Sequence, residues 1–318
     1  MNILITGATG FVGKALLANP AANRKFSMRG TARRSANIDD TAQIMTVGEL
    51  DANTDWRPVL NDIQVVIHCA ARVHIMNDTS ASPLEEFRRV NVAGTLNLAR
   101  QASAAGVHRF IFISSIKVNG EETRLGQAYK ADDVPAPIDA YGVSKYEAEL
   151  GLLALSRETG LEIVIIRPVL IYGPSVRANF LRMMHWMNKG IPLPLGALTG
   201  NRRSMVALDN LIDLIVTCID HPAAANQVFL VSDGEDLSTT ALLRRTALSM
   251  NKKARLFPVP AILLQLAAKL VRKGDVAQRL CGSLQVDIEK TRRLLKWHPP
   301  LDVDAGLALA AKDFLEKR

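Results

Sequence analysis

The chain opens with Met1-Asn2-Ile3-Leu4-Ile5-Thr6-Gly7-Ala8-Thr9-Gly10-Phe11-Val12-Gly13, an apolar run that leads into a glycine-rich turn. The run predicts a buried strand, and the residues after the turn predict the start of a helix. Glycines allow so tight a turn and let a phosphate approach the backbone, because they carry no Cβ. Free N–H groups at the helix start would face that phosphate. The stretch therefore predicts a dinucleotide site, although its spacing is G-x-x-G-x-x-G and not G-x-G-x-x-G.

Strands and helices alternate along the first half of the sequence. Apolar runs predict parallel strands at residues 2–6, 26–31, 65–69, 109–114 and 163–167. The longest helical stretches between them cover residues 84–105 and 140–158. This alternation predicts an α/β fold with a Rossmann-type, doubly wound parallel sheet. After Arg167, prolines and glycines mark loops, a helix at 208–220 and a strand at 227–232 follow, and helices then dominate.

A tyrosine and a lysine stand four residues apart in Asp139-Ala140-Tyr141-Gly142-Val143-Ser144-Lys145. A free tyrosine has a pKa near 10 and is a poor base at neutral pH. A lysine one helical turn away favours the phenolate, so Tyr141 can exchange a proton with a substrate. Ser115 can hydrogen-bond the same substrate oxygen. Together with the dinucleotide turn, these residues predict hydride transfer at a carbon that bears oxygen.

The chain resembles the extended short-chain dehydrogenase/reductase family, which contains nucleotide-sugar epimerases, dehydratases and reductases. The motifs that carry the resemblance are Gly7 to Gly13, His68-Cys69-Ala70-Ala71, Asn91-Val92-Ala93-Gly94-Thr95, Ser114-Ser115, Tyr141 to Lys145, Arg167-Pro168, Tyr172-Gly173-Pro174 and residues 203–211. The resemblance implies that Ser115, Tyr141 and Lys145 are catalytic. Ser115 is selected over Ser114 because it lies five residues before the glycine of a family motif that here reads Val118-Asn119-Gly120, with Asn119 in place of a tyrosine.

The resemblance also implies a domain division and a set of cofactor contacts. Residues 1–168 and 202–233 would form the dinucleotide-binding domain. Residues 169–201 and 234–318 would form a smaller, mainly helical and discontinuous substrate lobe. The expected cofactor contacts are Gly7, Thr9, Gly10, Phe11, Val12, Gly13, Arg33, Arg34, Glu49, Leu50, Ala70, Ala71, Asn91, Lys145 and Pro168.

The end of the second predicted strand bears on the choice of cofactor. An NAD enzyme usually has an acidic residue there to hold the ribose hydroxyls. This chain has Arg33, Arg34 and Ser35, which suit a 2′-phosphate because guanidinium groups match phosphate oxygens. We therefore predict a preference for NADP(H), with NAD(H) also possible. A solvated basic loop is the alternative.

Three residues are expected to contact a nucleoside-diphosphate sugar, most simply a UDP sugar, together with Ser115. Asn179 and Arg203 stand where the resemblance places contacts to the diphosphate, and Arg279 lies near a third such position, beside Arg272 and Lys273. For the arginines, an ordinary surface position is the alternative. We also expect a homodimer joined through helices 84–105 and 140–158.

Bulk properties exclude several other classes. The 318 residues are 48% apolar, and the net charge of +8 is dispersed with only 5% aromatics, which fits phosphate-bearing ligands better than nucleic acid. The three cysteines show no C-x-x-C spacing, the six histidines form no metal-ligand spacing, and no signal peptide or membrane span is seen. A cytoplasmic enzyme without a metal is expected. The apolar stretch 259–271 is interpreted as a lobe helix, with loose membrane association as the alternative.

The reaction itself is left open among three classes. The first is an NADP(H)-dependent reductase of a nucleotide-linked 4-keto-6-deoxy-N-acetylamino sugar, as the resemblance to bacterial polysaccharide-cluster (O-antigen type) members implies. The second is a UDP-sugar 4-epimerase with tightly bound NAD. The third is a non-catalytic dinucleotide-binding protein, which the intact Ser115, Tyr141 and Lys145 disfavour. A dehydratase is disfavoured because Ile116 and Lys117 stand where that class has an Asp-Glu pair. The reductase is the main prediction and the epimerase is its alternative.

Overall fold

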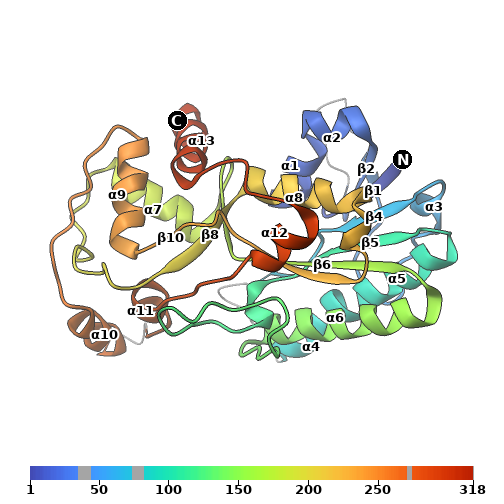
Figure 1. The fold of residues 1–318 in the computed structure, drawn as a ribbon, viewed down its shortest axis with the longest axis horizontal. Coiled ribbons are helices and arrows are strands. Elements are labelled where there is room, and N and C mark those ends of the chain that lie inside the picture. Colours follow the sequence, from blue (N-terminus) through green and yellow to red (C-terminus); the bar gives the residue numbers. More distant parts are fainter. Residues whose placement is uncertain (35–43, 74–81, 271–273, 318) are drawn as a thin grey trace.

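A computed structural model of the protein describes residues 1–34, 44–73, 82–270 and 274–317, apart from the side chains of residues 275 and 277 (Figure 1). Ser35, Arg272 and Lys273 lie outside the described residues. Seven strands form one parallel sheet in the order β3-β2-β1-β4-β5-β6-β9, as predicted for a Rossmann-type fold. Their bounds are β1 Asn2–Thr6, β2 Ser27–Ala32, β3 Ile44–Thr46, β4 Val65–His68, β5 Arg109–Ile113, β6 Glu162–Pro168 and β9 Gln227–Val231.

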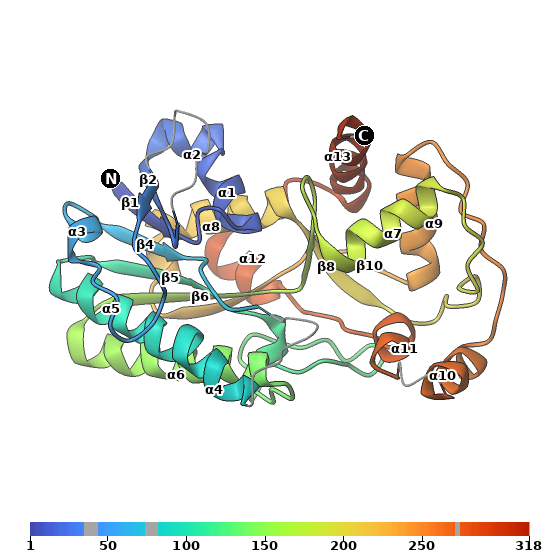
Figure 2. The same cartoon turned by 180° about the vertical axis from the view of Figure 1, so that it is seen from behind.

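Helices cover both faces of this sheet, which explains why its central strands are apolar on both sides. On one face α1 (Phe11–Leu17), α8 (Leu208–Asp220) and α12 (Glu289–Leu295) pack over Ile3, Ile5 and Ile67. On the other face α3 (Arg57–Leu60), α5 (Thr95–Ala104) and α6 (Ala140–Thr159) pack over Leu4, Val66 and Phe110. Figure 2 shows α5 and α6 running side by side beneath the sheet. Because the strands are parallel, their carboxyl ends share one edge, and the predicted site residues follow several of them.

A second, smaller unit lies beside the carboxyl edge of the sheet (Figure 1). It holds a three-stranded sheet of β7 (Leu170–Tyr172), β8 (Arg203–Ala207) and β10 (Asp236–Leu237). The helices α7 (Ala178–Asn188), α9 (Thr239–Ser249) and α13 (Val303–Glu316) share its core. Two further helices, α10 (Ala261–Leu270) and α11 (Gly274–Cys281), lie at its lower edge.

The described lobe is mainly helical, as the sequence predicted, and it also contains a small sheet. β8 pairs with β7 in parallel and with β10 in antiparallel orientation, so residues 203–207 join the small sheet, although the sequence assigned 202–233 to the first domain. The helix and strand that follow, α8 and β9, do return to the large sheet. The strand β7 is three residues long and follows a proline, which explains why no strand was predicted there.

One predicted helix is divided in the structure. Residues 84–105 form α4 (Pro83–Phe87), a π-helical segment over Arg88–Gly94, and then α5. The wider turn of the π-helix places Asn91 in the interior, where its amide group hydrogen-bonds Ser144 Oγ at 3.0 Å and the Arg72 carbonyl at 3.0 Å. Single-turn π segments of this kind often occur at functional sites. α2 (Pro20–Lys25) completes the described helices of the first unit.

Candidate active site

The turn after β1 has a shape that only glycine permits. Gly7 has φ +67°, and a Cβ at this position would lie 2.8 Å from the Ala70 backbone nitrogen. A Cβ on Gly13 would collide with the Gly7 carbonyl. These glycines bring three backbone segments together at the carboxyl edge of the sheet: the turn, the start of α1 and the residues after β4. The open backbone at the N-terminus of α1 fits a dinucleotide pyrophosphate.

The other predicted cofactor residues surround this turn. Ala70 and Ala71 follow β4 and are half-buried, while Leu50 is buried and would contact any side chain placed on Gly94. Asn91 Oδ1 accepts a hydrogen bond from the Arg72 backbone nitrogen at 2.8 Å, which fixes the chain after Ala71. Thr9 is exposed, Phe11 and Val12 are half-buried, and Pro168 is buried at the end of β6. Most of these residues lie at the carboxyl ends of the parallel strands or in the loops that follow them, while Phe11 and Val12 begin α1 and Asn91 lies in the π-helical segment.

The two arginines predicted to bind a 2′-phosphate are exposed after β2. Arg33 Nη1 lies 3.7 Å from Glu49 Oε2, and both side chains are largely in solvent. An acidic side chain therefore stands beside Arg33, contributed by the loop after β3 and not by β2 itself. The predicted preference for NADP(H) stays a prediction.

The first turn of α6 and the end of β5 bring the predicted catalytic residues together. Asp139 caps α6 by accepting a hydrogen bond from the Gly142 backbone nitrogen at 2.7 Å. This cap places Tyr141 in the first turn, with its ring 5.9 Å from that of Phe87 in a T-shaped arrangement. The Tyr141 phenol hydrogen-bonds the Ser115 hydroxyl, which lowers the phenol pKa. Residues 26 positions apart in the sequence thus form one polar pair.

The structure corrects the expectation that the phenolate of Tyr141 is favoured in this state. Burial, and then the negative charge of Asp139, raise the pKa of Tyr141 to about 12 despite the hydrogen bond from Ser115. Tyr141 is therefore neutral at physiological pH in the protein as described. The physical reason is that burial removes water from the charged form of the phenol and that Asp139 places a negative charge near it.

Lys145 is itself almost fully buried, with 1% of its surface exposed. Its ammonium lies 3.9 Å from the centre of the Phe112 ring, and burial lowers its pKa to about 7 while Glu149 and Cys69 oppose the shift. The same environment keeps His68 uncharged, since burial and then Lys145 lower the pKa of its imidazole to about 3. Thr6 and Thr95 hydrogen-bond the two ring nitrogens of His68. Sequence reasoning did not foresee this buried layer beneath the site.

The two adjacent serines have different surroundings. Ser114 is buried and donates to Glu149 Oε1 at 2.5 Å, whereas Ser115 is half-buried and faces Tyr141. Glu149 in turn forms a buried bidentate pair with Arg167, at 2.6 and 3.0 Å. This arrangement leaves Ser115 as the serine available to a substrate.

The same network explains Asn119. Its Oδ1 accepts from Arg167 Nη1 at 2.9 Å, and its Nδ2 donates to the Lys130 carbonyl at 3.0 Å. Asn119 thus completes the coordination of a buried guanidinium, which must be fully hydrogen-bonded to be tolerated in the interior. The asparagine that replaces the family tyrosine therefore stabilises the buried Arg167–Glu149 pair beneath Ser115.

The loop after Ser115 carries Lys117, which forms ion pairs with Glu121 and Asp139. Lys117 is therefore held by the residue that caps α6. Positions 116 and 117 carry no carboxylic acid, which is the reason that the sequence disfavours dehydratase chemistry.

On the substrate side, the structure brings Arg203 and Arg279 close enough to interact. Burial, followed by the positive charge of Arg279, lowers the pKa of Arg203. Arg203 Nη1 donates to the Gly282 carbonyl at 3.3 Å. A cavity of about 570 Å³ lies beside it, lined by residues 122–125 and 281–283. The negative charge of Glu122, which lines this cavity, acts on the pKa of Arg203 in the opposite direction and partly offsets the repulsion between the two arginines. Asn179 is exposed in the first turn of α7.

Comparison with known proteins gives the family. The model of the NAD-dependent epimerase/dehydratase family matches residues 3–232. This chain belongs to that family. It is 50% identical over 315 residues to a UDP-glucose 4-epimerase of Vibrio cholerae, covering 99% of this chain and 96% of that protein. It is 27% identical over 303 residues to an N-acetyl-α-D-glucosaminyl-diphospho-ditrans,octacis-undecaprenol 4-epimerase of Escherichia coli O157:H7, covering 91% and 88%.

Solved structures confirm the fold. A UDP-glucuronic acid 4-epimerase from Bacillus cereus in complex with NAD superposes with a TM-score of 0.80 at 22% identity, over 99% of this chain and 97% of that one. A UDP-glucose 4-epimerase from Thermotoga maritima with UDP-glucose gives 0.78 at 21% identity, over 100% and 99%. The predictions of family, fold class and enzymatic nature are confirmed.

Proposed function

We propose that this protein is a UDP-sugar 4-epimerase that inverts the configuration at C4 with a tightly held NAD. The observation that carries the proposal is the 50% identity, over nearly the full length of both chains, to the Vibrio cholerae UDP-glucose 4-epimerase. This favours the sequence-based alternative over the main prediction of a reductase. The two reactions share the same residues, because both move a hydride and a proton at C4.

In this proposal the paired Ser115 and Tyr141 handle the proton of the C4 hydroxyl. Tyr141 withdraws the proton and later returns it, while Ser115 hydrogen-bonds the same oxygen. Bound NAD supplies a hydride acceptor and donor for C4. Lys145 has a pKa of about 7, so near neutral pH it can carry the positive charge that lowers the pKa of Tyr141. The buried position of Lys145 makes this charge effective, since little water screens it.

The residues present fit a dinucleotide. The glycine turn at Gly7 to Gly13 would hold the pyrophosphate, and Leu50, Ala70 and Ala71 would line the path toward the adenosine. Lys145 would hydrogen-bond the nicotinamide ribose. Glu49, rather than Arg33 and Arg34, would then face the adenosine ribose, which suits NAD.

The substrate would be bound by its diphosphate. Arg203 and Arg279 lie beside the cavity lined by residues 122–125 and 281–283, and guanidinium groups bind phosphate oxygens well. Asn179 would hydrogen-bond the nucleotide side. The Escherichia coli relative acts on a diphospho-undecaprenol sugar, so the substrate panel should include a lipid-linked diphosphate sugar beside the UDP sugars.

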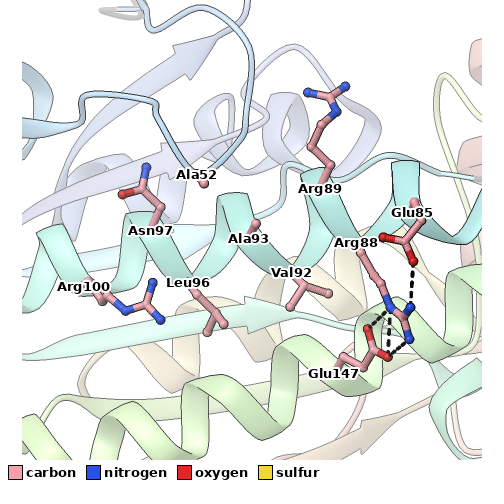
Figure 3. Close-up of a pocket in the computed structure, with 10 residues that line it drawn as sticks. All are labelled: Ala52, Glu85, Arg88, Arg89, Val92, Ala93, Leu96, Asn97, Arg100 and Glu147. Atoms are coloured by element: carbon pink, nitrogen blue, oxygen red, sulfur yellow. Dashed lines mark hydrogen bonds and ion pairs between the residues drawn. The ribbon is translucent and has the colours of Figure 1, made fainter.

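We also propose a homodimer joined through α5 and α6. Their outer surface carries a groove lined by residues such as Val92, Leu96 and Arg88, with Arg88 bonded to Glu85 and Glu147 (Figure 3). Leu150 on the neighbouring α6 is 50% exposed. Two neighbouring helices whose outer surface carries both apolar and charged side chains can pack against the same two helices of a second copy as a four-helix bundle.

The test uses the protein as purified, without added cofactor. UDP-glucose, UDP-galactose, UDP-N-acetylglucosamine and a lipid-linked diphosphate sugar are each supplied, and the products are identified by chromatography and mass spectrometry. The proposal expects conversion to the C4 epimer at constant absorbance of the reduced nicotinamide. Bound nucleotide released by acid should be NAD. Absence of any epimer, with active control enzyme in the same assay, would overturn the proposal.

The reductase remains the second candidate because of Arg33 and Arg34, two exposed cations after β2. If the protein is a reductase, it should consume one equivalent of NADPH for each UDP-4-keto-6-deoxy-N-acetylhexosamine that it reduces. Binding titrations with NAD and NADP separate the candidates independently of the sugar, since only the reductase needs a 2′-phosphate site.

A further inference from the structure

The helix α10 turns its apolar side away from the protein. Ala261, Leu264 and Ala268 are half-buried, and the first two pack against the core of the lobe. The opposite side carries Ile262, Leu263, Leu266 and Leu270, which are 69%, 55%, 54% and 86% exposed. A spacing of i, i+1, i+4 and i+8 places these four on one stripe of a helix. We call Ile262, Leu263, Leu266 and Leu270 the outer stripe.

This pattern reverses the usual arrangement of a surface helix, which directs its apolar stripe to the core. No residue of α10 is fully buried. The polar residues Gln265 and Lys269 lie on the flank between the two sides and not opposite the core. A contiguous exposed apolar stripe of this kind marks a docking surface.

The sequence around α10 is strongly basic. From Asn251 to Gly274 it contains no aspartate or glutamate, and its cations are Lys252, Lys253, Arg255, Lys269, Arg272 and Lys273. Lys269 is exposed on α10 itself, and Lys252, Lys253 and Arg255 are exposed before it. A basic segment with an apolar stripe is complementary to a surface that is both apolar and negatively charged.

The dimensions of α10 favour a lipid surface over a second copy of the chain. A helix of ten residues is about 15 Å long. Four side chains cover far less than the roughly 800 Å² per partner that a stable protein interface needs. Two copies would also bring their basic segments together. An interfacial helix needs only to sink about 5–10 Å into the headgroup region, for which one stripe suffices. Among the residues that the structure describes, no helix could cross a bilayer.

We propose that α10 docks this enzyme on an anionic lipid bilayer, with the outer stripe in the headgroup region and the exposed Lys269 against lipid phosphates. α10 packs against α11, which carries Arg279, and Gln278 of α11 hydrogen-bonds Glu122 at 2.8 Å. The docked face therefore adjoins the wall of the cavity beside Arg203. Figure 1 shows α10 and α11 at the edge of the lobe, remote from α5 and α6, so docking leaves that pair of helices free.

The test is flotation of the purified full-length enzyme with vesicles, without substrate. Vesicles of phosphatidylglycerol with phosphatidylethanolamine are compared with vesicles of phosphatidylcholine alone. The wild type should float with the anionic vesicles, and the bound fraction should fall as salt rises. The double variant Leu263→Gln/Leu266→Gln should bind at least tenfold more weakly, and Lys269→Glu should also weaken binding. The matched control is Leu248→Gln, which alters a leucine on α9 that is 72% exposed and should bind like the wild type.

Two outcomes would overturn the proposal: no flotation of the wild type with anionic vesicles, or equal flotation of Leu263→Gln/Leu266→Gln. A fall in oligomeric mass of the double variant would also overturn it, because the outer stripe would then join copies of the chain. The altered side chains are exposed, so thermal unfolding and turnover of a UDP sugar should match the wild type. Vesicle binding is measured without any reaction, so its failure is distinct from failure of the proposed epimerase activity.

Discussion

At the scale of single residues, Tyr141 shows how burial and hydrogen bonding act against each other. Desolvation keeps its phenol neutral, and the hydrogen bond with Ser115 lowers the phenol pKa against that effect. A neutral phenol can donate a proton at once, but it can accept one only after a positive charge has lowered its pKa. The nearby Lys145, with a pKa of about 7, is the group of this chain that can supply such a charge.

Replacing Tyr141 with phenylalanine keeps the ring against Phe87 and removes the oxygen that carries the proton. Turnover should fall by about 100-fold or more, the usual contribution of a general acid–base group. Circular dichroism and cofactor binding should stay near those of the wild type. Turnover within threefold of the wild type, in protein shown to be folded, would exclude Tyr141 as the proton carrier.

Replacing Lys145 with methionine should stabilise the cofactor-free protein while it impairs cofactor binding and turnover. The pKa of Lys145 is lowered from 10.5 to about 7, so the folded state binds its proton less well than the unfolded state does. Above about pH 10.5 Lys145 is neutral in both the folded and the unfolded state, so it does not lower the free energy of unfolding. As the pH falls toward 7 the unfolded state takes up the proton first, and the free energy of unfolding decreases. At pH 6 the gain from methionine should be about 1 kcal/mol or more, and it should shrink as pH rises to 10.

The measurement is urea unfolding of both proteins at pH 6 and pH 9.5, after removal of bound nucleotide. A gain that is larger at pH 9.5 than at pH 6 would contradict the assigned burial of the ammonium.

At the scale of elements, β5, α6 and β6 are joined by polar side chains and not by apolar packing alone. Ser114 follows β5, Glu149 lies in α6 and Arg167 lies in β6, and together they form one buried network that ends at Asn119. This network fixes α6 along the sheet, and therefore fixes where Tyr141 meets Ser115. A polar network of this kind specifies geometry only when every member is satisfied.

The two adjacent serines give a matched test of this view. Ser114→Ala removes a hydrogen bond to a buried carboxylate, so the free energy of unfolding should fall by about 1.5–3 kcal/mol with little change in KM. Ser115→Ala should lower kcat by about tenfold or more. It should lower the free energy of unfolding by only about 1 kcal/mol, because the Ser115 hydroxyl also accepts a hydrogen bond from the Lys117 backbone nitrogen at 3.2 Å. Chemical unfolding and steady-state kinetics of both variants decide the point. A fall in kcat for Ser114→Ala and a fall in stability for Ser115→Ala would show instead that Ser114 contacts the substrate.

At the scale of the whole molecule, three surfaces have separate roles in our proposals. The carboxyl edge of the large sheet holds the reaction, the outer surface of α5 and α6 pairs two copies, and α10 meets lipid. The first two of these surfaces share α6, which carries Tyr141 and Lys145 in its first two turns and Leu150 farther along, whereas α10 is a separate element. The small sheet of β7, β8 and β10 connects the lobe to the large sheet through β6 and α8.

The pairing of copies can be tested at Leu150, which is half-exposed on α6. Leu150→Arg would place a charge in the apolar centre of the proposed interface, so the dimer should dissociate at micromolar concentration. Light scattering after size-exclusion chromatography measures the mass, and Leu248→Arg on α9 is the control. A wild type that is monomeric at all concentrations would refute the proposed interface.

The sequence by itself determined the fold class and the family. β1 and α8 have the predicted bounds, because an apolar run closed by a glycine turn and a helix with a strong apolar face are determined locally. The glycine spacing and the Tyr-x-x-x-Lys pair are also local patterns. Each of these signals lies within a few residues, so no knowledge of distant contacts was needed.

Only the tertiary structure decided the pKa values of these residues and the contacts that hold them in place. The raised pKa of Tyr141 and the lowered pKa of Lys145 come from burial among Phe112, Glu149 and other side chains from separate strands and helices. The π-helical turn at Asn91, the place of β8 in the small sheet and the role of Asn119 depend on partners 11 to 53 residues away. Likewise, the sequence shows that α10 is apolar, but only packing reveals that its leucines point outward. Desolvation and long-range hydrogen bonds arise when the chain folds, so they cannot be predicted from local sequence.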